Sequence, residues 1–198
     1  ITDANVDSLI TLKQTNANGS NINFEAVINT DKKLITITPD NSFSSEELDS
    51  TMPSLIMFIC NHCPYVIHYH GELQRLTEDY QDDFNLVAIS SNDIVNYPQD
   101  GPDKMKLLWK DLGLSFPYLF DESQEIAKKY KAECTPEFYL FDKEKKLVYR
   151  GRFDATSPGS ENKPDGLDLR NAMQNCLDGN EISGEQHPSM GCNIKWID

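Results

Sequence analysis

The chain has 198 residues, the size of one compact domain with additions. Its 18 Lys and Arg against 32 Asp and Glu give a formal net charge of −14, which argues against nucleic acid or an anionic membrane as a partner. No apolar run approaches the ~18 residues of a membrane span, so we expect a soluble protein, and the N-terminal sequence fits a cytoplasmic or an exported one equally.

Residues 1–52 predict a β extension ahead of the main domain. Apolar and polar side chains alternate in segments 22–28 and 34–37, which flank the polar stretch 29–32. Alternation with a period of two is typical of half-buried strands, and a short polar link between two strands favours a hairpin. We therefore expect an N-terminal hairpin formed by these two segments.

Residues 53–179 predict an α/β domain with a mixed sheet flanked by helices. The apolar strand 54–59, the helix 64–80 and the apolar strand 84–89 form a βαβ unit, whose crossover helix makes the two strands parallel. The predicted elements that follow are helix 103–112, strand 117–120, helix 122–131, a hairpin of strands 138–141 and 146–153, and helix 168–177. We expect the irregular tail 180–198 to pack on this domain, pinned by Trp196.

Two of the five cysteines lie in Cys60-Asn61-His62-Cys63-Pro64, between the first buried strand and its helix. Five cysteines are too few for a disulfide scaffold in a chain of this length. Free backbone N–H groups and the helix dipole at the start of a helix stabilise a thiolate. The position therefore predicts a redox dithiol, against the alternative of two buried structural thiols.

Either cysteine of this motif can be the nucleophile. If Cys60 attacks, Cys63 resolves it, and His62 between them biases the thiolate. If Cys63 attacks, it is the N-cap, and Pro64 fills the first helical position, where a missing N–H costs nothing. The apolar run ends at Ile59 and leaves loop residues before Cys63, so we favour Cys63.

A second proline opens a predicted strand in Cys134-Thr135-Pro136. Proline cannot donate to a strand ladder and suits a tight turn with a cis peptide bond. Such a turn can lie against the dithiol and leave the backbone of Thr135 free to pair with an extended substrate. The alternative is a proline that simply begins a strand.

These elements, in this order, resemble the thioredoxin fold. Several strings resemble the peroxiredoxin-like branch of that family, with its alkyl hydroperoxide reductase and thiol-specific antioxidant type of domain. They are MFICNHCPYV (57–66), SND (91–93) with NYP (96–98), PYLFDE (117–122), CTP (134–136), YRG (149–151) and GCNIKW (191–196). The resemblance spans roughly residues 53–196.

The resemblance implies a thiol oxidoreductase that performs thiol-disulfide exchange or peroxide reduction, with a cis Pro136 facing the cysteines. It places His62 where thioredoxins have a loop aromatic, Cys63 at the nucleophile and Val66 where their resolving cysteine stands. Peroxiredoxins have a threonine three residues before the peroxidatic cysteine, and Cys60 holds that place here. The implied partners are a dithiol reductant protein and a disulfide or peroxide substrate, with no organic cofactor.

The resolving thiol stays open among Cys60, Cys134 and Cys192. Cys192 either folds back to the site or is a buried anchor beside Trp196, and Cys176 has the helical spacing of a core residue.

Two arginines and one loop are further candidates for the surroundings of the cysteine site. Arg150 and Arg152 share a face, either as a cation for the thiolate or as a solvated pair. Loop 92–103, with Tyr97, is expected to wall the site, because ligands bind beyond the carboxyl ends of parallel strands.

Two other functions would use the same fold. A copper or zinc carrier would bind through Cys60, Cys63 and a histidine. His68 lies ~140° around the helix axis from Cys63, so a further ligand such as His187 would be needed, and we predict no bound metal. The other alternative is a redox-inactive binding domain. The two cysteines at the start of the helix argue against it.

Overall fold

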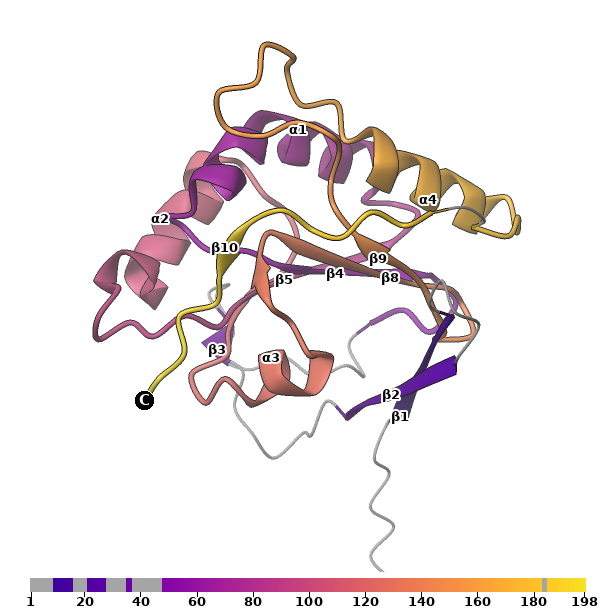
Figure 1. Ribbon diagram of the computed structural model, residues 1–198, viewed down its shortest axis with the longest axis horizontal. Helices are drawn as coiled ribbons and strands as arrows, with labels where there is room; N and C mark the ends of the chain where they lie inside the picture. The colour runs from indigo at the N-terminus through magenta and orange to yellow at the C-terminus, as the bar shows by residue number, and fades with distance from the viewer. Residues whose placement is uncertain (1–8, 16–20, 28–34, 37–47, 183–184) are drawn as a thin grey trace, which may run out of the picture.

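A six-stranded mixed sheet forms the centre of the protein in a computed structural model that describes residues 9–15, 21–27, 35–36, 48–182 and 185–198 (Figure 1). The strand order is β3-β6-β5-β4-β8-β9. The bounds are β3 Ile35–Thr36, β4 Ser54–Phe58, β5 Asn85–Ser90, β6 Tyr118–Phe120, β8 Glu137–Phe141 and β9 Leu147–Gly151.

The parallel part of the sheet is the predicted βαβ unit. β4 runs parallel to β5 and β5 parallel to β6, because a helix connects each pair across the sheet. β8 pairs antiparallel with β4, and the tight β8–β9 link makes that pair an antiparallel hairpin. This order places the carboxyl end of β4, where Cys60 follows, beside the start of β8, where Pro136 precedes it.

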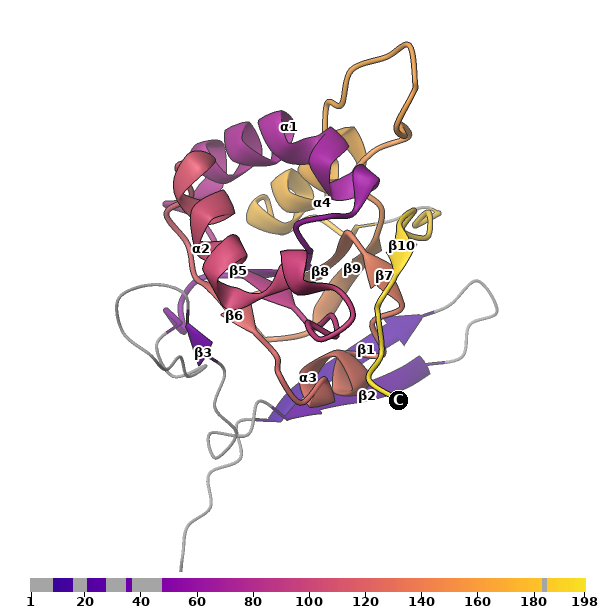
Figure 2. The ribbon, with the colours of Figure 1, turned by 90° about the vertical axis from the view of Figure 1, so that its left-hand side faces the viewer.

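Helices cover both faces of the sheet (Figures 1 and 2). Helices α1 (Pro64–Tyr80), α2 (Pro102–Asp111) and α4 (Leu167–Leu177) lie on one face, and α3 (Glu125–Tyr130) lies on the other. The alternation of β4 divides the core accordingly: Leu55 and Met57 pack toward the α1 side, and Ile56 and Phe58 toward α3. The thioredoxin-like fold expected from the sequence is confirmed.

The N-terminal hairpin exists, but its strands differ from those predicted. β1 (Leu9–Thr15) pairs antiparallel with β2 (Asn21–Val27), whereas β3 pairs antiparallel with β6. Alternation identifies a strand but not its partner, and the outer edge of β6 offers free backbone groups that β3 satisfies. The pairing of segment 22–28 with 34–37 was therefore wrong, and its turn at 29–32 lies outside the described residues.

The C-terminal tail returns to the sheet edge instead of only wrapping the surface. Its strand β10 (Cys192–Asn193) pairs antiparallel with β7 (Cys134–Thr135), beside the start of β8 (Figure 2). Ile194 is the anchor, 3% exposed, while Trp196 is 41% exposed, so pinning by Trp196 was wrong. Within the described ranges, the helices are too short or too polar to cross a membrane.

Candidate thiol site

The dithiol motif lies where β4 ends and α1 begins. Cys63 is the N-cap of α1, with extended backbone angles (φ −67°, ψ 123°), and Pro64 occupies the first helical position, as predicted. The side chains of Cys60 and Cys63 are both fully buried. Their position gives Cys63 the free N–H groups of a helix start.

The turn before β8 packs against both cysteines. The Thr135–Pro136 peptide bond is cis, as the resemblance implied. The carbonyl oxygen of Thr135 lies 3.0 Å from Cys63 Sγ, and its hydroxyl lies 3.2 Å from Cys60 Sγ. The fold therefore brings together the predicted residues Cys60, Cys63, Thr135 and Pro136, although about seventy residues separate the two segments.

A third sulfur lies at the same place. Cys192 Sγ is 3.0 Å from Cys63 Sγ, and Cys192 pairs with Thr135 between β10 and β7. The backbone of Thr135, expected to be free for an extended substrate, is thus occupied by the chain's own tail. The structure places Cys192 beside Cys63 and not as an anchor beside Trp196.

The contacts around Cys63 favour its thiolate. The Cys60 thiol donates to Cys63 and is the largest cause that lowers the pKa of Cys63 to about 4. Burial opposes this shift, and the thiol of Cys192 and the backbone N–H groups of Val66 and Cys192 support it. The carbonyl of Thr135 accepts only from a protonated Cys63, so it works against ionisation, but several donors outweigh it.

Cys60 is held in the opposite state. Its pKa is raised, first by its hydrogen bond to Cys63, then by burial and by the negative charge of Asp100. A thiol that donates to its neighbour keeps its own proton. Cys60 and Cys63 thus form an asymmetric pair, with the charge on Cys63.

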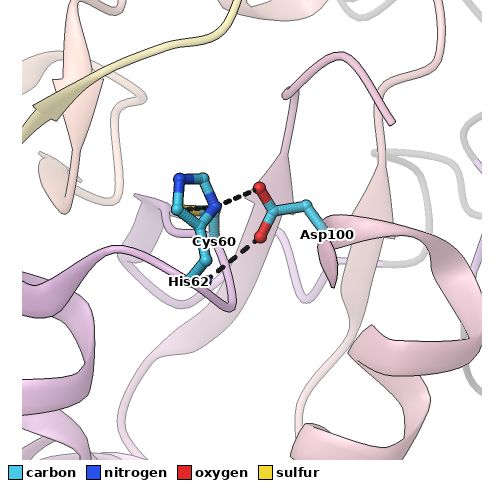
Figure 3. A group of neighbouring side chains, drawn as sticks. All are labelled: Cys60, His62 and Asp100. Carbon is cyan, nitrogen blue, oxygen red and sulfur yellow. Dashed lines mark hydrogen bonds and ion pairs between the residues drawn. The ribbon is translucent and has the colours of Figure 1, made fainter. Parts of the chain in front are cut away.

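A buried carboxylate organises the loop between the two cysteines (Figure 3). Asp100 is fully buried and accepts from the backbone N–H groups of Asn61 (2.8 Å) and His62 (3.2 Å). Its other oxygen lies 2.5 Å from His62 Nδ1 and accepts from the Asn92 amide at 2.8 Å. Tyr97 stacks on the His62 ring at 5.4 Å, so loop 92–103 does form a wall of the site.

Asp100 is a residue that the sequence reasoning missed. It lies 38 residues from His62, and no spacing rule joins the two. The available signal was its position in the polar loop after β5, at the sheet edge where side chains from different segments meet.

Three potential metal ligands lie close together, two from the loop between the cysteines and one from loop 92–103. Cys60 Sγ, His62 Nδ1 and a carboxylate oxygen of Asp100 all lie within 4.8 Å of one another. This set differs from the ligands considered from sequence, because Asp100 takes the place of Cys63. Both Asp100 oxygens already accept hydrogen bonds from the protein. The position of Asp100 is therefore explained equally well by a role in holding the loop between the cysteines and by a role as a metal ligand.

The remaining candidates lie away from Cys63 or are paired. Cys134 contacts the carbonyl of Pro136, and burial raises its pKa to about 12. Cys176 is half-buried on α4, where burial raises its pKa to about 11. Arg150 pairs with Glu137 and Arg152 with Asp168, so they are neither a solvated pair nor a cation for the thiolate. Sequence spacing could not show these carboxylate partners.

Two bacterial proteins of solved structure are similar over most of this chain. An uncharacterized conserved protein from Geobacillus kaustophilus is 44% identical over 83% of this chain and 88% of its own, with a TM-score of 0.80. A hypothetical protein from Sinorhizobium meliloti is 39% identical over 84% of this chain and 91% of its own, also with a TM-score of 0.80.

A more distant structure shows the same fold. A secreted disulfide oxidoreductase from Mycobacterium tuberculosis is 14% identical over 72% of this chain and 94% of its own, with a TM-score of 0.54. A search of curated proteins finds no match. The family model described as Redoxin matches residues 9–165. With its cysteine pair at a helix start and its cis proline, the chain belongs to the Redoxin family of thioredoxin-fold proteins, whose function is thiol-based redox chemistry.

Proposed function

We propose that the protein is a thiol oxidoreductase in which the thiolate of Cys63 attacks a disulfide substrate. The observation that carries this proposal is the environment of Cys63 at the start of α1. Thiol and backbone donors surround its sulfur and lower its pKa to about 4. An ionised sulfur at a helix start is both a nucleophile and a good leaving group.

The roles of the neighbouring residues follow from their contacts. Cys60 keeps its proton and stabilises the Cys63 thiolate through a hydrogen bond. His62 and Asp100 hold the connecting loop, and Pro64 begins the helix without an N–H to satisfy. Thr135 and Pro136 form the wall opposite the sulfur. A dithiol reductant protein would return the oxidised thiols to their starting state.

Disulfide exchange fits this site better than peroxide reduction. Cleavage of an O–O bond needs donors for the departing oxygen. Arg150 donates to Glu137 and to the carbonyl of Lys131, and Arg152 donates to Asp168. Because both arginines donate to other groups, neither is available to donate to the departing oxygen of a peroxide. The surroundings of Cys63 therefore favour thiol-disulfide exchange.

Single-turnover reactions test this function. Reduced protein is mixed with an oxidised small dithiol or with hydrogen peroxide, and its remaining thiols are counted over time. We expect oxidation by the disulfide, and a peroxide rate no higher than that of free cysteine. Cys63→Ser should abolish the disulfide reaction, Cys60→Ser should slow it, and Cys176→Ser is the matched control. Full reactivity in Cys63→Ser would contradict the proposal.

A metal carrier is a second candidate, favoured only by the closeness of Cys60, His62 and Asp100. It makes a different prediction. One equivalent of copper or zinc that remains bound through purification, and is lost in Asp100→Asn, would support it. Redox chemistry at Cys63 alone predicts no such retention.

A further inference from the structure

Strand β10 carries Cys192 onto the edge of the thiol site. Cys192 pairs with Thr135 and Asn193 with Cys134, and the N–H of Ile194 donates to the backbone carbonyl of Glu133 at 3.2 Å. Cys192 Sγ lies 3.0 Å from Cys63 Sγ. Cys63 is fully buried, whereas Cys192 is partly exposed. The tail therefore brings a second thiol into contact with the proposed nucleophile.

We propose that Cys192 is the resolving thiol of Cys63, delivered by a tail strand that occupies the Thr135 edge, so that the product disulfide joins Cys63 to Cys192 and not to Cys60. This inference rests on the proposed role of Cys63. It adds a catalytic residue 129 positions away in the chain.

Gly191 shows how closely the strand is seated. A Cβ atom at this position would lie 2.1 Å from the Thr135 carbonyl oxygen and 3.1 Å from the Pro136 nitrogen. A side chain here would therefore meet the backbone of the cis turn, which cannot move aside as a flexible side chain could. The tail is also held on both sides, because Ser189 donates to Gly151 O at 2.7 Å and Lys195 N donates to Asn92 at 2.8 Å.

The other two candidate thiols are less well placed to resolve Cys63. Cys134 contacts the carbonyl of Pro136, and two neighbouring glutamates oppose its ionisation. Cys60 also loses its hydrogen bond to Cys63 when Cys63 is oxidised, but its complete burial and the charge of Asp100 remain and disfavour its thiolate. Cys192 is partly exposed. Burial is the first cause that raises its pKa, but the next two, the hydrogen bond to Cys63 and the charge of Cys63, vanish when Cys63 is oxidised, and no carboxylate is among the causes.

The reaction balances as two exchanges. The Cys63 thiolate attacks one sulfur of the substrate disulfide, a Cys63–substrate disulfide forms, and the other half leaves as a thiolate. The Cys192 thiolate then attacks Cys63 Sγ, the Cys63–Cys192 bond forms, and the second half of the substrate leaves. The two protein thiols lose two electrons in total, and the substrate disulfide gains them as two thiols after protonation.

The same geometry restricts access to Cys63. While β10 is paired with β7, it fills the Thr135 edge and covers the sulfur. A substrate must therefore displace β10 to reach Cys63, and resolution occurs when the strand returns.

Oxidised glutathione provides the test, because the two exchanges leave different products. With wild-type protein we expect two released glutathiones and a Cys63–Cys192 disulfide, identified by peptide mass spectrometry. Cys192→Ser should stop at a Cys63–glutathione adduct with one glutathione released, while Cys176→Ser behaves as wild type. Closure to Cys60 or Cys134, or a second release from Cys192→Ser, would overturn the inference and leave the proposed function intact. Absence of any adduct or disulfide at Cys63 would contradict the proposed function itself.

A second variant tests delivery of the thiol without removing a sulfur. Gly191→Ala keeps all five cysteines but pushes β10 off the cis turn. Loss of alignment should slow the second glutathione release on the order of 100-fold, with the first release no slower. Gly71→Ala is the matched control, because its Cβ would meet only the end of Arg75 at 3.9 Å. An unchanged second release in Gly191→Ala would show that β10 does not deliver Cys192.

Discussion

Cys63 should stay ionised at pH values several units below those at which an ordinary cysteine becomes protonated. Its pKa is lowered from 9.0 to about 4, first because the Cys60 thiol donates to it. At pH 5 such a group is ~90% thiolate, against ~0.01% for an unshifted thiol, a ratio of about 9,000. Five units of lost basicity at a Brønsted slope near 0.45 reduce the intrinsic nucleophilicity ~180-fold. The net advantage of Cys63 at pH 5 is therefore ~50-fold.

The same arithmetic reverses at alkaline pH. At pH 9 the unshifted thiol is about half ionised, so Cys63 should be slower by ~90-fold, and the two rate curves should cross near pH ~6.7. Burial of Cys63 lowers its rate at every pH, so the shape of the profile is the decisive quantity. The thiolate should be lost only as the pH falls through about 4, because the folded-state pKa lies below its ordinary value.

The assay combines ultraviolet absorbance of the thiolate with iodoacetamide labelling read by mass spectrometry. Cys60→Ala removes the largest cause of the shift and should move the Cys63 midpoint upward, whereas Cys176→Ser should not move it. A Cys63 midpoint close to 9 in the wild-type protein would refute the reasoning. A midpoint that Cys60→Ala leaves unchanged would refute the assigned cause.

Three further substitutions test how the fold holds the site. Asp100→Asn replaces one of the two acceptor oxygens by an NH2 group, so either the backbone N–H groups of Asn61 and His62 or the side chains of His62 and Asn92 lose their acceptor. The free energy of unfolding measured in urea should fall by about 2 kcal/mol. Cys60 should also become easier to alkylate, and an unchanged urea midpoint would show that the carboxylate does not hold the loop. Phe58→Ala removes a fully buried ring that meets Tyr130 and Tyr139 edge-on and should cost ~3–5 kcal/mol, so a loss below ~1 kcal/mol would contradict its place in the core. Glu72→Gln removes the charge of a buried carboxylate that pairs with Arg75 and Arg170, and it should lower the free energy of unfolding by ~1–2 kcal/mol. The loss should be smaller in high salt, and a loss that does not depend on salt would rule out a charge effect.

Local signals in the sequence predicted the frame of the site well. Helix α1 begins at Pro64 and ends at Tyr80, as its periodicity and its proline indicated. The parallel β4–β5 pair and the β8–β9 hairpin followed from the order of apolar runs and turns. These features depend on contacts between neighbouring segments, which composition and spacing describe.

The parts that were missed depend on contacts between distant segments. Nothing near Ile35 indicated that β3 would pair with β6, and nothing near Asp100 indicated that it would accept from His62. Cys192 was recognised as a candidate, but only the pairing of β10 with β7 places its sulfur against Cys63. In the sequence, Gly191 is the residue that bears most directly on this contact, because the absence of a side chain there lets the tail lie on the cis turn.

The segments that meet at Cys63 are held with unequal strength, and this inequality matters for the chemistry. The strand β4, the start of α1 and the cis turn are backed by the buried core. β10 contributes two paired residues, Ile194 directly after it is buried, and hydrogen bonds of Ser189 and Lys195 hold the tail on either side. Because hydrogen bonds and a single buried apolar side chain hold the described tail 185–198, its local opening should require less free energy than opening of the core. The groups that ionise Cys63 from Cys60 and α1 thus stay in place while the strand that covers it moves, which keeps the nucleophile prepared as the substrate enters.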